Sequence, residues 1–259
     1  MIENRLQEFL TVALDAARAA RVLIMSYYNG SFEIEIKADQ TPVTVADRGA
    51  EQLIRKNILK AFPDHGIYGE EYGAQDKNNE YLWLVDPIDG TKSFVKRYGM
   101  FSTQIALMHR GELIMGVSCA PAMDELVWAT RGGGAFDENG PLRISSTYRI
   151  EQSSISTGNI QTLAASKRWP ALGRILAMAN RTRGYGDYYH YHRLAAGQLD
   201  AVIESDVIIL DIAALYVIVT EAGGAFTDLD GEKINLETRS VLAAPPSLHA
   251  GLSEVLKPV

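Results

Sequence analysis

Two aspartates that directly follow an apolar run constrain the fold of this chain more than any other feature of its sequence. In the stretch LVDPIDGTKSF, residues 84–94, Asp86 ends the run YLWLVD and Asp89 follows three residues later. Carboxylates at the end of a buried strand cost free energy unless a cation pairs with them. The chain must therefore fold so that something neutralises these two charges.

Apolar periodicity predicts helices and strands along the whole chain. A stripe at helical spacing runs from Leu6 to Tyr27 and stops at Asn29-Gly30, which indicates a long amphipathic helix. We expect further helices over residues 45–62, 170–180, 187–197, 211–224 and 247–256. We expect strands over residues 32–37, 66–69, 81–86, 102–109, 112–121, 125–130, 134–140, 153–158, 200–205 and 240–245. This alternation predicts stacked sheets covered by helices.

The pattern of predicted elements changes near residue 145, which suggests two halves. Residues 1–145 form an α+β half with hairpin-connected strands, and residues 146–259 form an α/β half. With 259 residues, of which 47% are hydrophobic, the chain has ample material for a core. No repeat or flexible linker separates the halves, so we expect one compact unit.

Net charge and cysteine content exclude several classes of partner and site. The net charge is −7, which disfavours uniform binding to nucleic acid or to an anionic membrane. The one cysteine, Cys119, allows no intrachain disulfide and no cysteine-based zinc site, and a reducing cytoplasm is the natural compartment. Charged residues interrupt the N-terminal apolar stretch, so we expect neither a signal segment nor a membrane span.

Five acidic residues stand at the ends of predicted elements: Asp47, Glu70, Asp86, Asp89 and Asp211. Either Asp47 or Asp211 alone would be interpreted as a helix N-cap. That interpretation fails for the set, because no matching group of lysines and arginines is placed to neutralise it. Carboxylates without cationic partners indicate a hard metal ion, Mg²⁺ or Mn²⁺, which prefers oxygen ligands.

The DPIDG spacing supports this interpretation. Pro87 fixes the turn, so that Asp86 and Asp89 can converge, and the Ile88 carbonyl between them offers a third oxygen. Gly90 lets the backbone approach a ligand closely. The amides of Gly90 and Thr91 stand at a predicted helix start, a position that favours phosphate binding.

Four motifs in order resemble those of the inositol monophosphatase-like family of metal-dependent phosphatases. They are KADQTPVTVAD (residues 37–47), GEE (69–71), VDPIDGTKSF (85–94) and LDIAALYVIVTEAGG (210–224). The resemblance covers nearly the whole chain. One position departs from the family pattern, because Leu210 stands where the family usually has Trp. We expect metal binding to survive this change, since that Trp is a packing residue.

The resemblance implies a role for each matching residue. Glu70, Asp86 and the Ile88 carbonyl would hold one metal ion. Asp86, Asp89 and Asp211 would hold a second, and a third, weaker ion would bind near Glu70. Thr91, hydrogen-bonded to Asp47, would assist the attacking water, and the Gly90 and Thr91 amides would bind phosphate.

The resemblance also implies an overall fold and a reaction. The fold would be a layered α-β-α-β-α sandwich of the α+β class. The reaction would be Mg²⁺-dependent hydrolysis of a small-molecule phosphate monoester by metal-activated water, with Mn²⁺ as an alternative ion. Homodimers and inhibition by lithium are common in the family.

The choice of phosphate ester depends on the segment from Arg181 to Ser205, which resembles the histidinol-phosphatase branch. Asp187 and Glu204 would hold the cationic part of L-histidinol phosphate by charge-assisted hydrogen bonds. The alternative for Asp187 is a purely structural role as the N-cap of the following helix. Inositol-1-phosphate is the second candidate substrate, and a 3′-phosphonucleotide is the third.

One alternative belongs to a different class of function. The chain would then be a non-catalytic metal- or phosphate-binding protein, although all five acids and Thr91 are intact.

His190 and His192 are two residues apart on a predicted helix, so their side chains point in different directions. They are therefore not expected to bind one metal ion together.

Overall fold

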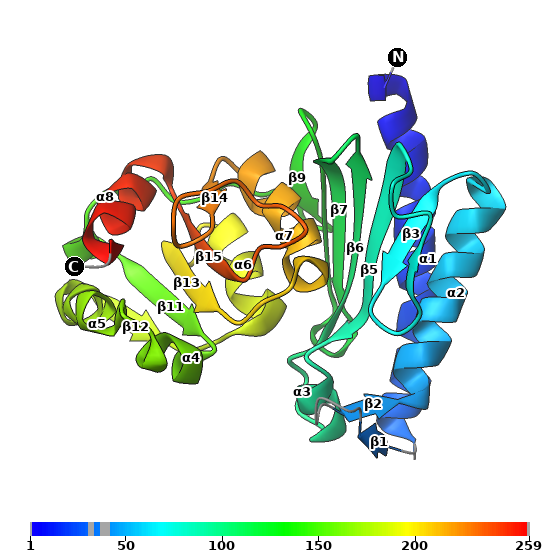
Figure 1. Cartoon of the computed structure of the whole chain (residues 1–259), viewed down its shortest axis with the longest axis horizontal. Coiled ribbons are helices and arrows are strands. Elements are labelled where there is room, and N and C mark those ends of the chain that lie inside the picture. The colour runs from blue at the N-terminus through cyan, green and yellow to red at the C-terminus, as the bar shows by residue number, and fades with distance from the viewer. Residues whose placement is uncertain (1, 31–33, 37–41, 258–259) are drawn as a thin grey trace.

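The computed structural model describes residues 2–30, 34–36 and 42–257 (Figure 1). The helices are α1 (Ile2–Asn29), α2 (Val45–Ala61), α3 (Thr91–Val95), α4 (Ile160–Ala165), α5 (Trp169–Met178), α6 (Asp187–Ala195), α7 (Ile209–Glu221) and α8 (Pro246–Leu256). The strands are β1 (Ile34–Ile36), β2 (Pro42–Thr44), β3 (Gly66–Gly69), β4 (Gly73–Gln75), β5 (Tyr81–Asp89), β6 (Ser102–His109), β7 (Glu112–Ala120), β8 (Glu125–Thr130), β9 (Gly134–Asp137), β10 (Gly140–Pro141), β11 (Ser154–Gly158), β12 (Arg181–Arg183), β13 (Ala201–Ser205), β14 (Ala225–Thr227) and β15 (Ser240–Ala244).

These elements stack in five alternating layers (Figure 1). Helices α1 and α2 cover one face of an eight-stranded sheet of order β10-β9-β8-β7-β6-β5-β3-β4. Helices α6 and α7 lie between this sheet and a five-stranded sheet of order β12-β11-β13-β15-β14. Helices α4, α5 and α8 cover the outer face of the second sheet. The predicted α-β-α-β-α sandwich is therefore confirmed.

The first sheet is buried on both faces, and this explains its sequence pattern. Strand β6 is buried over seven of its eight residues, because α1 packs on one face and α7 on the other. On α1 the predicted stripe supplies that contact, with Phe9, Ala13 and Ile24 fully buried. A strand buried on both faces becomes a nearly continuous apolar run rather than an alternating one.

Helix α7 is the centre of the stack. It is apolar nearly all round, as expected for a helix covered on both sides. Gly116 on β7 lets it come close, because a Cβ atom there would lie 2.4 Å from the Ala214 carbonyl oxygen. This close approach fixes the start of α7, which carries Asp211, relative to the first sheet.

Most predicted elements are confirmed, and the differences concern short ones. The sequence did not predict β2, β4, β10, β12, β14 or α4, which are two to six residues long. Strand β3 pairs with β5 in parallel, so the first sheet is mixed rather than antiparallel throughout. The predicted strand over residues 32–37 and the motif segment 37–41 lie partly or wholly outside the described residues. In the described part of the chain, every helix is too short or too polar to span a bilayer.

Candidate active site

A break in the pairing of β5 with β6 creates the first part of the site. The register shifts between Asp86, which is opposite Gln104, and Asp89, which is opposite Ser102. Pro87 lies in this irregular segment, where its missing N–H removes no regular ladder bond. The Asp86 side chain accepts a hydrogen bond from the Ile88 N–H at 2.9 Å and is 2% exposed. The bulge therefore turns both aspartates away from the sheet ladder.

Gly90 makes the turn from β5 into α3. Its φ is +84°, and a Cβ atom there would lie 2.7 Å from the Met100 carbonyl oxygen. Only glycine accepts both conditions without strain. Helix α3 begins at Thr91 immediately afterwards, at the predicted helix start.

Asp47 lies at the start of α2 and reaches toward Thr91. Its Oδ2 accepts hydrogen bonds from the Thr44 N–H at 2.7 Å and the Thr44 hydroxyl at 2.5 Å, and the first of these is one half of a capping box in which the Thr44 side chain accepts a backbone N–H of the first turn. Its Oδ1 lies 3.4 Å from Thr91 Oγ1, whose single hydrogen has a second acceptor within reach, the Ile88 carbonyl at 3.0 Å. The structure thus brings Asp47, Thr91 and the Ile88 carbonyl together.

Asp211 arrives from the other half of the chain, on the first turn of α7. Its Oδ2 accepts the Ile208 N–H at 2.9 Å. Asp86, Asp89 and Asp211 each offer one carboxylate oxygen, and these three oxygens all lie within 4.8 Å of one another. Two elements distant in sequence, β5 and α7, therefore converge at one point.

Glu70 follows β3, next to the end of β5. Its backbone N–H donates to the Val85 carbonyl at 3.2 Å. Its negative charge is close enough to raise the pKa of Asp47, Asp86 and Asp211. Glu70 therefore belongs to the same acidic group as the three converging aspartates.

The electrostatics of this group fit a divalent cation. Burial and repulsion by neighbouring carboxylates raise the pKa of Asp86 and Asp89 well above the usual range, and burial raises that of Asp211 to about 7. In the described part of the chain, no lysine or arginine forms an ion pair with these three aspartates. A set of close oxygen donors without a cationic side chain matches the chemistry that Mg²⁺ or Mn²⁺ requires.

A cavity of about 350 Å³ opens beside the acidic group. Residues from both halves line it: Glu70, Gly90, Thr91, Lys92, Ser93, Tyr98, Asn159, Asp187 and Asp211. A smaller cavity of about 30 Å³ shares three of these residues and adds Asp89, Tyr191 and Glu204. The sequence-predicted residues Asp187 and Glu204 therefore lie next to the acidic group.

Asp187 is not an N-cap. It is the first residue of α6, where Gly186 takes the cap position and no side chain forms a cap hydrogen bond. Its φ is +48°, an uncommon value for a residue other than glycine. Burial and the charge of Glu204 raise its pKa to about 6. The carboxylate accepts no hydrogen bond from any described residue, so it stands available on the cavity wall.

Glu204 on β13, unlike Asp187, forms hydrogen bonds with neighbouring side chains. Its Oε2 accepts hydrogen bonds from Tyr191 Oη at 2.7 Å and lies 3.1 Å from His190 Nε2. Gly158 makes room for it, because a Cβ atom there would lie 1.8 Å from Glu204 Oε1. His190 and Tyr191 thus hold Glu204 in place at the edge of the cavity.

Several residues that line the cavity were not predicted from the sequence. Asn159 follows β11 with a φ of +49°, and the rule that polar residues at strand ends build sites could have identified it. Lys92 and Tyr98 line the cavity too, and nothing in their local sequence indicated this. Leu210 is 2% exposed and packs in the central apolar cluster, outside both cavities.

Known proteins are similar in sequence to this chain over most of its length. A match to the inositol monophosphatase family covers residues 5–258. The histidinol-phosphatase of Chlorobaculum parvum is 34% identical, with 94% of each chain covered. The histidinol-phosphatase of Mycobacterium tuberculosis is 37% identical over 86% of this chain and 87% of its own length. The inositol monophosphatase of Dictyostelium discoideum is 33% identical, with 97% of this chain and 96% of the relative covered.

Solved structures are similar in fold to this chain over most of its length. The extragenic suppressor protein SuhB from Bartonella henselae has a TM-score of 0.89 and 29% identity, with 96% of this chain and 98% of that chain covered. The inositol monophosphatase from Anabaena has a TM-score of 0.85 and 29% identity, with 98% of each chain covered. Sequence and fold similarity therefore extend across all five layers.

Proposed function

Because this chain belongs to the inositol monophosphatase family, we propose that it hydrolyses L-histidinol phosphate to L-histidinol and phosphate with the help of a divalent metal ion. It is a phosphoric monoester hydrolase, as are the relatives with which it shares its full length. The choice among phosphate esters rests mainly on one observation, the Asp187 carboxylate on the cavity wall.

The metal-binding residues we propose are those whose oxygens converge. Asp86, Asp89 and Asp211 would share one ion, and Glu70, Asp86 and the Ile88 carbonyl would hold another. Bound divalent ions neutralise charge on the phosphate, lower the pKa of water and stabilise the leaving alkoxide. Their charge would also offset the repulsion that now raises the pKa of the aspartates.

The residues around the metal site would position water and phosphate. Asp47 is fixed by Thr44, and it orients the Thr91 hydroxyl, whose oxygen can then accept a hydrogen bond from the attacking water. The Gly90 and Thr91 amides at the start of α3 would bind phosphate oxygens. Lys92 lines the same cavity and adds positive charge near that phosphate.

Asp187 would select the substrate. Histidinol phosphate carries an ammonium group close to its phosphate, and a carboxylate that has no protein donor can bind it by a charge-assisted hydrogen bond. The pKa of about 6 leaves Asp187 mostly ionised at neutral pH, and a bound cation would favour the charged form further. Glu204 already accepts from His190 and Tyr191, so we assign it a supporting role.

Several properties are proposed from the family alone. They are Mg²⁺ as the preferred ion, two or three ions per site, inhibition by Li⁺, a homodimer and a cytoplasmic location. Cys119 is buried, and burial raises the pKa of its thiol to about 11, which agrees with a structural rather than a redox role.

Inositol-1-phosphate is the second candidate substrate. The inositol monophosphatase of Dictyostelium discoideum matches as fully in length as the histidinol-phosphatases do. Asn159 and Glu204 at the cavity could exchange hydrogen bonds with a polyol. A polyol gives no charge-based role to Asp187, however, so we place it second.

A phosphate-release panel tests the proposal. Purified protein with Mg²⁺ would be assayed on histidinol phosphate, inositol-1-phosphate, a 3′-phosphonucleotide and an aryl phosphate, with and without Li⁺. We expect the highest kcat/KM on histidinol phosphate. Asp187→Asn should lower that value about 10- to 100-fold, mainly through KM, because the negative charge that strengthens the hydrogen bond to the ammonium group is lost. The same variant should change the aryl phosphate value by less than about threefold.

Asp76→Asn is the matched control, because Asp76 is exposed and has a similar φ of +51°. Asp76→Asn should leave kcat/KM unchanged on both histidinol phosphate and the aryl phosphate. Equal losses on both esters in Asp187→Asn would remove the argument for specificity. Wild-type preference for inositol-1-phosphate would establish the second candidate, and absence of phosphate release from every ester would favour a non-catalytic metal-binding protein.

A further inference from the structure

A chain of buried polar side chains leads from Asp89 to a second cavity, and the proposed reaction does not use it. Its members are Ser102, Gln104, Ser118 and His192, which are all 1% exposed or less. Ser102 and Gln104 lie on β6, and Ser118 lies opposite Gln104 on β7. His192 reaches the strands from α6. We call these four residues the relay.

The first two links of the relay have a defined direction. Ser102 Oγ lies 3.3 Å from Asp89 Oδ2 and donates to it when Asp89 is ionised, the state that binds a metal ion, because an ionised carboxylate can only accept. Ser102 must then accept from Gln104, which is 2.7 Å away. Since only the amide nitrogen of Gln104 can donate, this contact fixes the orientation of the amide.

The outer links follow from that orientation. The second hydrogen of Gln104 Nε2 goes to Ser118 Oγ at 3.0 Å. Ser118 can then donate its own hydrogen to His192 Nε2 at 2.8 Å, which requires that this nitrogen carries no proton. His192 Nδ1 carries the proton instead and donates to Glu125 Oε2 at 2.9 Å. The two inner links therefore donate toward Asp89, and the outer links, from Gln104 through Ser118 and His192, donate away from it toward Glu125.

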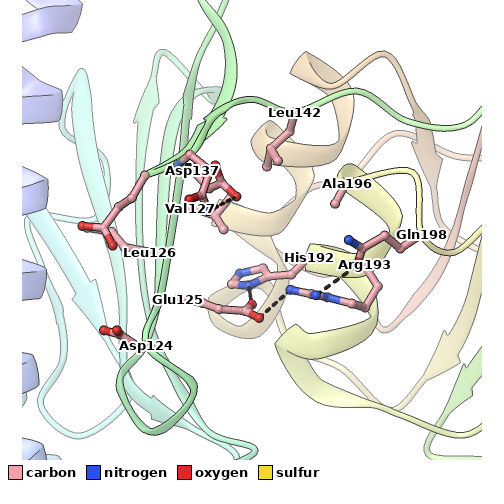
Figure 2. Close-up of a pocket in the computed structure, with 12 residues that line it drawn as sticks. Asp124, Glu125, Leu126, Val127, Asp137, Leu142, His192, Arg193, Ala196 and Gln198 are labelled. Carbon is pink, nitrogen blue, oxygen red and sulfur yellow. Dashed lines mark hydrogen bonds and ion pairs between the residues drawn. The ribbon is translucent and has the colours of Figure 1, made fainter.

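Figure 2 shows the outer end of the relay at the wall of a cavity of about 220 Å³. Glu125 lies between His192 and Arg193, and its Oε1 accepts from Arg193 Nη2 at 2.5 Å. Burial lowers the pKa of His192 and favours its neutral form. Glu125 thus selects the tautomer of His192 that the rest of the relay needs.

One atom of the relay lowers the stability of the fold. Gln104 Oε1 is buried and, within the described part of the chain, has no hydrogen-bond partner. A buried unpaired carbonyl costs free energy. A methionine would fill this space without that cost, so the two donor contacts of Gln104 suggest a purpose beyond packing.

We propose that the relay holds Asp89 in the orientation required for metal binding, with Gln104 and His192 as positioning residues. The role rests on the proposed metal-dependent function. Ser102 is the one hydrogen-bond donor that the described residues direct at the Asp89 side chain. Partners that orient a metal ligand in this way typically affect metal affinity about 10- to 100-fold.

Binding of Mn²⁺ to the metal-free protein, measured by calorimetry, tests the relay without relying on activity. Ser102→Ala should weaken binding about tenfold, and Gln104→Met and His192→Phe about three- to tenfold. The double variant Gln104→Met with His192→Phe should bind no more weakly than Gln104→Met alone, because either change already interrupts the relay. Saturating Mn²⁺ should return kcat of each single variant to within about threefold of wild type.

His65→Phe provides the matched control. His65 is a buried histidine that accepts a hydrogen bond from Trp83 Nε1 at 3.0 Å and has no contact with the relay. It should lower stability without changing Mn²⁺ affinity. Unfolding of each metal-free variant, followed in parallel, separates loss of fold from loss of binding.

The outcomes for the relay and for the proposed function can be told apart. Folded relay variants that bind Mn²⁺ as tightly as wild type would overturn the relay, even if histidinol phosphate is cleaved normally. Additive losses in the double variant would also overturn it. Weakened Mn²⁺ binding in proteins that cleave no ester would support the relay while the proposed function fails.

Discussion

At the residue scale, two acids of the candidate site serve their helices and the site together. Asp47 and Asp211 each accept the backbone N–H of the residue three positions earlier with Oδ2. Each thereby stabilises the first turn of its helix, a position where a negative charge is also favoured by the helix dipole. The sequence pattern favoured a functional role over a helix-cap role for these acids as a set, and the structure shows that contact with the helix start and a place in the site are compatible.

A buried histidine outside the site should make stability depend on pH. His65 accepts from Trp83 and stacks on Phe62 and Tyr81, and burial lowers its pKa to about 4. Between pH 6.5 and about 4 the unfolded chain binds a proton at this residue and the folded chain does not. The free energy of unfolding should therefore fall as pH falls through this window.

His65→Phe removes that contribution. The decrease in the free energy of unfolding between pH 7 and pH 4.5, measured by urea denaturation, should be smaller in the variant by ~1–2 kcal/mol. Other titrating groups are common to both proteins and cancel in the comparison. Equal decreases in the two proteins would show that His65 is not held neutral by the fold.

At the element scale, the position of α7 decides whether the site is complete. This helix carries Asp211, and it packs against the first sheet at Gly116, where the Ala214 backbone leaves no room for a side chain. The sequence predicted both the helix and the strand. It did not predict that they touch at a glycine, since the residues are nearly a hundred positions apart.

Gly116→Ala should displace α7 and with it Asp211. We expect a loss of ~1–3 kcal/mol in the free energy of unfolding, the usual cost of overpacking, together with weaker binding of Mg²⁺. Gly173→Ala is the control, because no heavy atom lies within 4 Å of a Cβ atom there, in the middle of α5. That change should stabilise the protein by ~0.5–1 kcal/mol. Wild-type stability and Mg²⁺ affinity in Gly116→Ala would contradict the proposed packing constraint.

At the scale of the whole molecule, the site lies where the two sheets and the central helices meet. The first half contributes Glu70, Asp86 and Asp89, and the second contributes Asp187 and Asp211. The division at residue 145 stays a prediction, because α7, which belongs to the second half, packs mainly on strands of the first sheet. Folding brings these carboxylates together, and the raised pKa values of the four aspartates reflect the cost.

Metal removal should therefore destabilise the whole fold at pH 8 more than at pH 5. Carboxyl groups with raised pKa bind more protons in the folded state than in the unfolded state, so metal-free protein loses stability as pH rises toward the pKa of about 7 of Asp211. At 100 times its Kd, Mg²⁺ should add ~3 kcal/mol, or about 5–10 °C in Tm. Thermal unfolding in EDTA and in Mg²⁺, with NaCl at matched ionic strength as control, measures this. An equal Tm in Mg²⁺ and NaCl at pH 8 would exclude the proposed metal site.

The sequence by itself determined the layered fold and the acids of the candidate site. Helical stripes, buried strands and capping boxes depend on residues close in sequence, and so do Asp86, Ile88, Asp89 and Gly90 within one turn. The short strands β4, β12 and β14 escaped prediction because their neighbours in the sheet, rather than their own residues, stabilise them.

Only the tertiary structure decided which distant residues meet. It placed Asp187 on the cavity wall rather than in a cap, bound Glu204 to His190 and Tyr191, and connected Asp89 through three strands to His192 on α6. Each of these contacts crosses strands or layers. Their geometry depends on strand register and helix packing, which arise when the whole core closes and leave no pattern in a local stretch of sequence.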